Sequence, residues 1–270
     1  DYVTFRNMTI QGVGASYVRF VYFAGGSDYN TFQNCIFRAP LNSTSTYRSC
    51  VVSTGGTDEY NTFRGNLFEG GYMGMYWYGT TYTIPGAERS TLIENNTFTN
   101  PYYYGIYMYY QSSPIVRNNT INMSSTTTNY GIVSYYMDRD YQITGNKISL
   151  LGASGTKYGM YLYTYYSSAN NASISPLVAN NFITVNGGGS TSYGMYLYYG
   201  YWTRVYNNTI HNSSTSTSST GMTIYYGNDN KIIDNIFHAT GGAMSYYLYQ
   251  LTNTSQMDYN VHYKVGTNLA

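Results

Sequence analysis

Acidic residues are the side chains of this sequence best suited to acid–base chemistry. Such chemistry can use two carboxyl groups whose pKa values differ. The densest charged cluster is MDRD, from Met137 to Asp140, and a second acidic pair is Asp58 with Glu59. Asp recurs at such points before stretches similar to YNTF, a position that is typical of a turn-forming residue. The sequence therefore predicts no catalytic residue, and we expect that the chain is not an enzyme.

Two histidines could bind a metal ion. His211 and His238 each follow the Asn of a recurring motif by three residues, which predicts one lane on adjacent turns of the chain. Two imidazoles about 5 Å apart could share a metal. The same position of other motifs holds Ser149, Thr184 and Asn122, none of which completes a convincing ligand set. We therefore predict a polar lane, with no metal site and no cofactor.

The composition excludes several classes of partner. Only 9% of the 270 residues are charged, and the net charge is +1, whereas about 25% of the residues in typical soluble domains are charged. Such a chain has no electrostatic attraction for nucleic acid or an anionic membrane. No run of about 18 apolar residues is present, so we predict no membrane span. The chain starts at Asp1 without a signal-peptide pattern, as expected of a processed or fragmentary chain.

A motif with a central Asn recurs along the chain, as in FRGNLF, IENNTF and VYNNTI. The central residues are spaced by 23 to 35 positions and are Asn34, Asn66, Asn96, Asn119, Asn146, Asn181, Asn208 and Asn235. A period of this length predicts a solenoid, a propeller or an array. Asn tolerates the left-handed conformation at a bend, and stacked amides can hydrogen-bond to one another. We therefore interpret these residues as a structural ladder.

The residues between the motifs alternate between apolar and polar types, which indicates strands rather than helices. A four-stranded propeller blade would need about 40 residues. Three short strands fit a repeat of roughly 28 residues better. We predict an all-β fold, a parallel β-helix of about nine to ten coils. Residues 1–270 are expected to form a single domain without separate caps.

One strand of each coil begins with Gly and continues with alternating Tyr, as in GMYLYTYY from Gly159. The residue after Gly is expected to face the core, which gives the stack Met75, Ile106, Ile132, Met160, Met195, Met222 and Met244. Four positions after Gly, or after Ala243 in the last case, lie Tyr78, Tyr109, Tyr135, Tyr163, Tyr198, Tyr225 and Tyr247. Two positions after Gly lie Tyr76, Tyr107, Tyr161 and Tyr196. Exposed aromatic lanes of this width are typical of an interface, either with protein or with sugar rings, while a redox or catalytic use is a lesser alternative.

The motifs NNTF, NNTI and YGIY resemble those of right-handed parallel β-helix proteins of the pectate-lyase-like superfamily. The resemblance covers essentially the whole chain and implies a right-handed coil. It does not specify an activity, because the superfamily includes polysaccharide lyases, hydrolases, phage tail spikes and adhesion proteins. Its enzymes place clustered acids, basic residues and sometimes calcium on an outward strand face. The corresponding lanes of this chain hold tyrosine.

Asn-X-Ser/Thr sequons in or beside Ser/Thr-rich loops predict glycosylation. These candidates are Asn42, Asn122, Asn171, Asn212 and Asn253. Cys35 and Cys50 would allow one disulfide, although the alternation places them on opposite sides of a strand.

The sequence starts directly in a strand pattern, DYVTFRN, and also ends in one, MDYNVHYKVG. Open ends of a solenoid can stack on each other head to tail. We therefore expect an extracellular or cell-surface microbial protein that forms a fibre, filament or surface layer with copies of itself and carries covalent glycans. The main alternative is a module that binds or cleaves a polysaccharide. A monomeric adhesin domain is a third interpretation.

Overall fold

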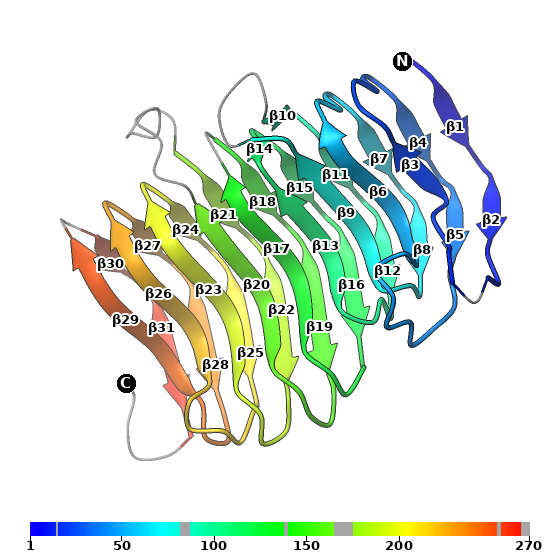
Figure 1. Cartoon of the computed structure of the whole chain (residues 1–270). Helices are drawn as coiled ribbons and strands as arrows, with labels where there is room; N and C mark the ends of the chain where they lie inside the picture. The colour runs from blue at the N-terminus through cyan, green and yellow to red at the C-terminus, as the bar shows by residue number, and fades with distance from the viewer. Residues whose placement is uncertain (15, 82–86, 138–139, 165–174, 253–254, 266–270) are drawn as a thin grey trace.

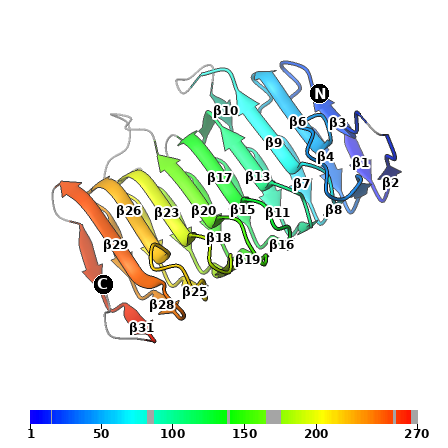
Figure 2. The same cartoon turned by 60° about the horizontal axis from the view of Figure 1, so that its bottom comes forward.

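The computed structural model describes residues 1–14, 16–81, 87–137, 140–164, 175–252 and 255–265. Its strands form three parallel sheets that wind around one axis, with the two ends of the chain at opposite ends of the solenoid (Figures 1 and 2). This arrangement confirms the predicted parallel β-helix. Within the described parts of the chain, no helix is long and apolar enough to cross a membrane.

The first sheet has ten strands of three residues each. They are β1 (Thr4–Arg6), β4 (Thr31–Gln33), β7 (Thr62–Arg64), β11 (Leu92–Glu94), β15 (Ile115–Arg117), β18 (Gln142–Thr144), β21 (Leu177–Ala179), β24 (Arg204–Tyr206), β27 (Lys231–Ile233) and β30 (Gln256–Asp258). The second sheet also has ten strands. They are β2 (Thr9–Gln11), β5 (Ile36–Arg38), β8 (Leu67–Glu69), β12 (Thr97–Thr99), β16 (Thr120–Met123), β19 (Lys147–Leu151), β22 (Phe182–Asn186), β25 (Thr209–Asn212), β28 (Ile236–Ala239) and β31 (Val261–Lys264).

The third sheet has nine strands, most of them longer than those of the other two sheets. They are β3 (Val21–Phe23), β6 (Ser49–Gly56), β9 (Met73–Gly79), β13 (Tyr104–Tyr109), β17 (Asn129–Met137), β20 (Lys157–Thr164), β23 (Ser192–Tyr201), β26 (Thr220–Asn228) and β29 (Met244–Thr252). A small pair, β10 (Glu88–Arg89) and β14 (Gln111–Ser112), lies outside the three sheets.

An Asn ladder occupies the tight bend between the first and second sheets. Asn66 Nδ2 donates to Asn96 Oδ1 at 3.0 Å, and Asn96 Nδ2 donates to Asn119 Oδ1 at 3.0 Å. The same amide-to-amide bond continues from coil to coil as far as Asn260. Each amide also donates to a backbone carbonyl, so the ladder satisfies buried backbone groups that water cannot reach.

The assignment of Asn34 to this ladder is wrong by one residue. Asn34 is exposed and has φ 53°, and the ladder position of its coil belongs to buried Cys35, whose N–H donates to Asn66 Oδ1. Asn95, Asn118 and similar residues take the left-handed position in later coils. The bend therefore uses two adjacent positions, one left-handed and exposed, the other buried in the ladder.

The core is a set of in-register apolar stacks. Phe32 stacks on Phe63 at 5.2 Å, and Phe68 stacks on Phe98 at 4.8 Å. The third sheet contributes the stack from Met75 to Met222, which is fully buried. Met244 does not continue this stack, because Met222 pairs with Tyr246. Cys35 and Cys50 are both buried and free.

Candidate binding face

The third sheet carries tyrosine in three outward lanes, numbered along the strand direction and fixed by strand register. The sequence predicted the second and third of these lanes. The second lane runs through Tyr76, Tyr107, Val133, Tyr161, Tyr196, Thr223 and Tyr247. The third lane runs through Tyr78, Tyr109, Tyr135, Tyr163, Tyr198, Tyr225 and Tyr249. The prediction that Tyr247 continues the lane of Tyr225 is wrong. Ser245 rather than Ala243 aligns with the preceding Gly221, so Tyr247 lies in the second lane.

A first lane, which the alternation did not predict, lies immediately before the glycines. It consists of Tyr104, Tyr130, Tyr158 and Tyr193. A Cβ at Gly105 would lie 2.5 Å from Gly131 O and 2.8 Å from the core side chain of Ile121. Gly105 thus turns its side-chain direction toward the core, as does fully buried Ile106. Two successive inward positions shift the phase of the strand and turn Tyr104 outward.

The three lanes together form a continuous aromatic surface, which we call the tyrosine face. In the first lane the ring centroids of Tyr130 and Tyr158 are 4.6 Å apart and the rings are nearly parallel, at 1°. In the third lane neighbouring rings are 4.4 to 6.3 Å apart. Rings of different lanes meet edge to face, as Tyr158 and Tyr161 do at 5.6 Å. Such contacts each contribute about 0.5–1.5 kcal/mol, so the lanes also stabilise the sheet.

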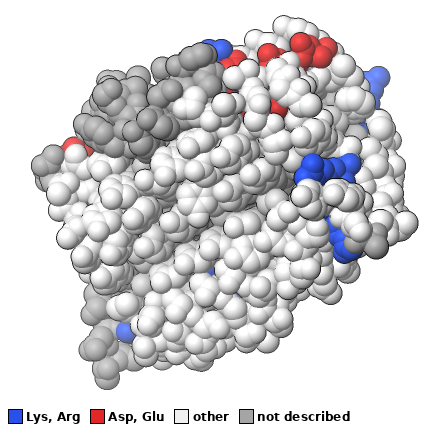
Figure 3. Space-filling view, in the orientation of Figure 1, with Lys and Arg blue, Asp and Glu red and all other residues white. Residues whose placement is uncertain are grey.

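The tyrosine face is electrically neutral. Burial, followed by the neighbouring tyrosines, raises the pKa of Tyr196 to about 12 and also raises the pKa of Tyr107 and of Tyr161. These phenols therefore keep their protons at physiological pH and offer O–H donors beside apolar rings. Figure 3 shows this side of the molecule, where charged side chains gather toward the N-terminal coils and the margins.

Acidic residues near the coil corners engage one another or arginine. Ser53 Oγ lies 2.7 Å from Asp58 Oδ2 and 2.8 Å from Glu88 Oε1, and all three residues are buried. One hydroxyl proton cannot serve both contacts, so one carboxyl group must carry a proton. Burial raises the pKa of Glu88 to about 8, which makes Glu88 the protonated partner. Sequence reasoning missed this pair because Glu88 lies 30 residues from Asp58.

Two other acids named in the sequence analysis also accept hydrogen bonds from neighbouring side chains. Glu59 accepts two hydrogen bonds from Arg89 at 2.7 Å, and Asp140 accepts one from Ser113 Oγ at 2.8 Å. Asp138, the other acid of the MDRD cluster, lies outside the described residues. Among the residues that the structure describes, no group of three or more His, Cys, Asp or Glu side chains could hold a metal ion.

The two predicted lane histidines lie side by side. His211 and His238 stack with their ring centroids 4.6 Å apart, and burial, then the charge of His238, lowers the pKa of His211.

Lys157, which the sequence analysis did not single out, is buried. Its Nζ donates to Ser125 O, Thr127 O and Asn129 Oδ1 at 2.6 to 2.8 Å. Burial lowers the pKa of Lys157 to about 8. These three acceptors match the three protons of an ammonium group, which indicates a structural role.

The candidate glycosylation sites divide by exposure. Asn42 and Asn122 are exposed. Asn212 is wrong as a candidate, because it is fully buried and its Nδ2 donates to Ser192 O and Thr220 O at 2.8 Å. Its Oδ1 accepts from Ser214 N at 3.0 Å, so donors and the acceptor of this amide are engaged within the protein. Asn171 and Asn253 lie outside the described residues.

Residues 1–174 match the family model described as a right handed beta helix region. The chain belongs to the right-handed β-helix family. None of the curated proteins compared with it matches significantly in sequence.

One solved structure shows the same fold at low sequence identity, and another matches more weakly. The A-module of a mannuronan C-5 epimerase of Azotobacter vinelandii matches with a TM-score of 0.51 and 11% identity, over 96% of this chain and 81% of that one. A surface adhesin of Streptococcus pneumoniae matches with a TM-score of 0.42 and 12% identity, over 90% of this chain and 64% of the adhesin. At these identities the likeness concerns the fold alone.

Proposed function

We propose that this chain is an extracellular β-helix protein whose tyrosine face binds a polysaccharide. The observation that carries the proposal is the alignment of three tyrosine lanes on one sheet, with rings stacked along the solenoid axis. Strands of successive coils are about 4.8 Å apart, so seven positions of one lane extend over about 29 Å. A surface of that length and regularity matches an extended, repeating ligand better than a single small molecule.

The chemistry of the face suits a sugar chain. A pyranose ring has apolar C–H faces and a rim of hydroxyl groups, and tyrosine combines an apolar ring with a hydroxyl in the same way. The rings already hold one another in place through stacking, so binding orders few side chains and loses little entropy. Surface aromatic patches of this extent are typical of binding sites.

Binding rather than cleavage is favoured by the placement of the acids. Glu94 accepts from Arg117 at 2.6 Å and also pairs with Arg64, both on the first sheet. Asp58 and Glu88 are buried against Ser53, where a polymer cannot reach them. These acids therefore stabilise the coils, and the tyrosine lanes bear no carboxylate that could act as a general acid or base.

A location outside the cell or at its surface is consistent with a polysaccharide ligand. We propose N-linked glycans at Asn42 and Asn122, whose side chains are exposed, and extend the proposal to Asn171 and Asn253 from their sequons alone. The intact mass of the native protein before and after enzymatic removal of N-glycans tests this directly. An unchanged mass would contradict it.

Affinity electrophoresis tests the binding proposal. The protein is run through native gels that contain dissolved neutral or acidic polysaccharides, and retardation reports binding. We expect Tyr107→Ser with Tyr161→Ser to remove most of the retardation. The matched control is Tyr29→Ser with Tyr60→Ser, which removes two stacked tyrosines, 4.8 Å apart, before strands β4 and β7 of the first sheet. Equal loss in both variants, or no retardation of the natural protein by any polysaccharide, would contradict the proposal.

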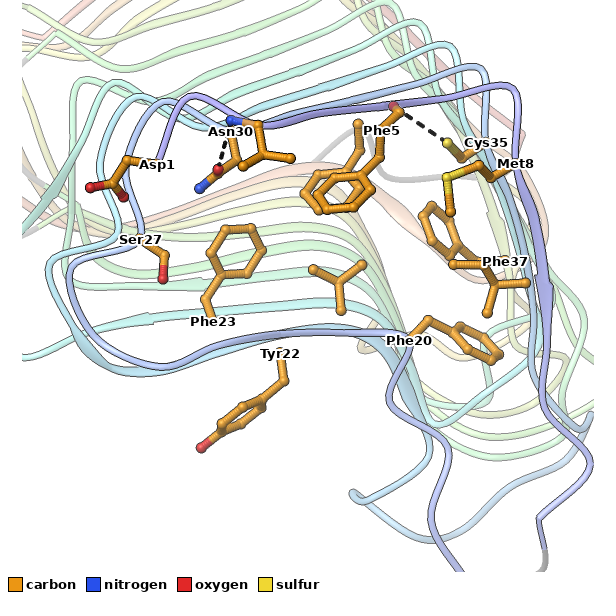
Figure 4. Close-up of a pocket in the computed structure, with 14 residues that line it drawn as sticks. Asp1, Phe5, Met8, Phe20, Tyr22, Phe23, Ser27, Asn30, Cys35 and Phe37 are labelled. Carbon is orange, nitrogen blue, oxygen red and sulfur yellow. Dashed lines mark hydrogen bonds between the residues drawn. The ribbon is translucent and has the colours of Figure 1, made fainter.

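Head-to-tail stacking of this chain is a second candidate, favoured by the apolar edge of the first coil. A pocket of about 340 Å³ opens there between Phe5, Met8, Phe20 and Phe23 (Figure 4). At the other end, Val261 and Tyr263 of β31 are more than half exposed. Coils that continue the same stacks would cover both edges. Sedimentation velocity over a range of concentrations tests this candidate, and a monomer at every concentration would contradict it.

A further inference from the structure

The tyrosine face contains a hollow where its lanes are interrupted by small polar residues. In β26 the first lane continues with Thr220 opposite Tyr193, and the second lane continues with Thr223 opposite Tyr196. Both threonines are nearly buried, at 2% exposure, and form the floor of a cavity of about 310 Å³. Its walls are Tyr193, Tyr196, Tyr225, Tyr247, Met244 and the loop residues Thr217 and Ser218.

Another interruption of the second lane shows that a missing ring need not leave a hollow. Val133 replaces tyrosine in β17, yet Tyr135 leans over the gap toward both neighbouring coils. Its ring centroid lies 5.8 Å from that of Tyr107 and 5.3 Å from that of Tyr161. At Thr223 the third-lane ring of the same strand, Tyr225, lies 6.5 Å from that of Tyr196, and two lanes are interrupted together.

The lining of the hollow specifies an uncharged ligand with hydroxyl groups. Thr220 Oγ1 and Thr223 Oγ1 are 2.6 Å apart on the floor, and each hydroxyl can still accept a hydrogen bond. The walls supply aromatic faces, and the lining residues include no Lys, Arg, Asp or Glu. A carboxylate placed here would lose its hydration without gaining a cation, which is costly. A neutral sugar ring would lose only hydroxyl hydration that the threonines can replace.

We propose that this hollow binds one neutral pyranose unit of the polysaccharide. The inference rests on the proposed function and adds to it the position of a specific subsite and the class of sugar. A volume of about 310 Å³ lies at the lower end of the range of about 300–1,000 Å³ for small-molecule sites, which suits one ring rather than several. The neighbouring lanes then support the flanking units, and the hollow fixes the register of the chain.

Titration calorimetry with Thr223→Tyr tests the subsite, because this change continues the second lane and fills the hollow. The probes are neutral gluco-, manno-, galacto- and xylo-oligosaccharides, with oligogalacturonate as the acidic probe. We expect the natural protein to bind at least one neutral series, and Thr223→Tyr to weaken that binding at least tenfold. Thr223→Ser, which keeps the hydroxyl, should stay within about threefold of the natural protein.

The matched control is Thr54→Tyr, which extends the third lane by one ring, because Thr54 pairs with Tyr78 far from the hollow. It should leave the affinity unchanged, and the melting temperatures of both variants verify that they fold. Unchanged affinity of Thr223→Tyr would overturn the subsite while the proposed function stands. Preference of the natural protein for oligogalacturonate would overturn the neutral class. Absence of binding to every probe and polysaccharide would overturn the proposed function itself.

Discussion

Two sets of repeated residues run along this solenoid, and they differ in what their polar atoms do. In the Asn ladder, Asn119 accepts from Asn96 N and Nδ2 at 2.9 and 3.0 Å and donates to Ile93 O and Asn146 Oδ1. In the tyrosine lanes, residues such as Tyr161 meet their neighbours mainly through ring faces and edges and remain partly exposed. The hydrogen-bonding groups of the Asn side chains are engaged within the protein, whereas the tyrosines still present ring surface to a ligand.

Repetition along the solenoid does not by itself distinguish structural residues from functional ones. Both sets place one residue per coil, and both add stability through contacts between coils. Burial and the use of hydrogen-bonding capacity separate them. A substitution in the Asn ladder should therefore affect folding, whereas a substitution in the tyrosine face should mainly affect binding.

The largest effect is expected from Asn119→Ala. It removes the acceptor of a buried N–H and leaves Ile93 O without its side-chain donor, each at about 1–3 kcal/mol. We expect the free energy of unfolding, measured by urea denaturation, to fall by about 3 kcal/mol. The control is Asn118→Gly, at the adjacent exposed position with φ 55°, where Gly is conformationally suited and the change should be below about 1 kcal/mol. Equal effects at both positions would contradict the ladder account.

A smaller effect, dependent on pH, is expected from the buried Glu88. Its pKa is raised to about 8 from the usual 4.5, so between these values the folded chain holds a proton that the unfolded chain has released. Stability should therefore fall as pH rises from 5 to 8, by on the order of 2 kcal/mol. Glu88→Gln should remove this dependence in melts across that pH range. A dependence of equal size in the variant would assign it to other groups.

A still smaller stability effect is expected on the tyrosine face. Tyr161→Ser removes one ring that packs against Tyr135, Tyr158 and Tyr196, and should reduce the free energy of unfolding by about 1 kcal/mol. Urea denaturation measures this change beside that of Asn119→Ala. A loss as large as that of the Asn variant would mean that the lanes are chiefly structural.

The smallest effect concerns the pH dependence of binding. Because burial raises the pKa of Tyr107, Tyr161 and Tyr196, that of Tyr196 to about 12, these phenols keep their protons from pH 6 to 9. The affinity for a neutral oligosaccharide, measured by calorimetry, should vary by less than about twofold over that range. A sharp loss near pH 7 would point to a carboxyl or imidazole group in the site.

The repeat period and the alternation were sufficient to predict the coil and two of its tyrosine lanes. They could not place Asn34, because both the left-handed and the ladder position accept Asn, and a coil with one Asn leaves the choice open. They could not place Tyr247, because β29 has Ser245 where earlier strands have Gly. They missed the first lane, since strict alternation turns Tyr104 inward, although the recurring Tyr-Gly pair was a usable signal.

The hollow and the buried pair of Asp58 with Glu88 depend on distances between coils. Whether a gap in a lane closes, as at Val133, or stays open, as at Thr223, depends on how the flanking rings lean. The sequence pattern contains no information on the orientation of these rings. Features that belong to one residue position could be predicted, and features that arise between coils could not.

Oxidative footprinting of the tyrosines, read by mass spectrometry with and without a bound neutral oligosaccharide, shows directly whether the tyrosine face binds sugar. Tyr29 and Tyr60 serve as an internal reference. Their ring centroids are 4.8 Å apart, and the pair lies outside the tyrosine face. The account predicts that the sugar lowers oxidation of Tyr161 and Tyr196 and leaves that of Tyr29 and Tyr60 unchanged. Protection of the reference pair alone, or equal protection of all four, would contradict it.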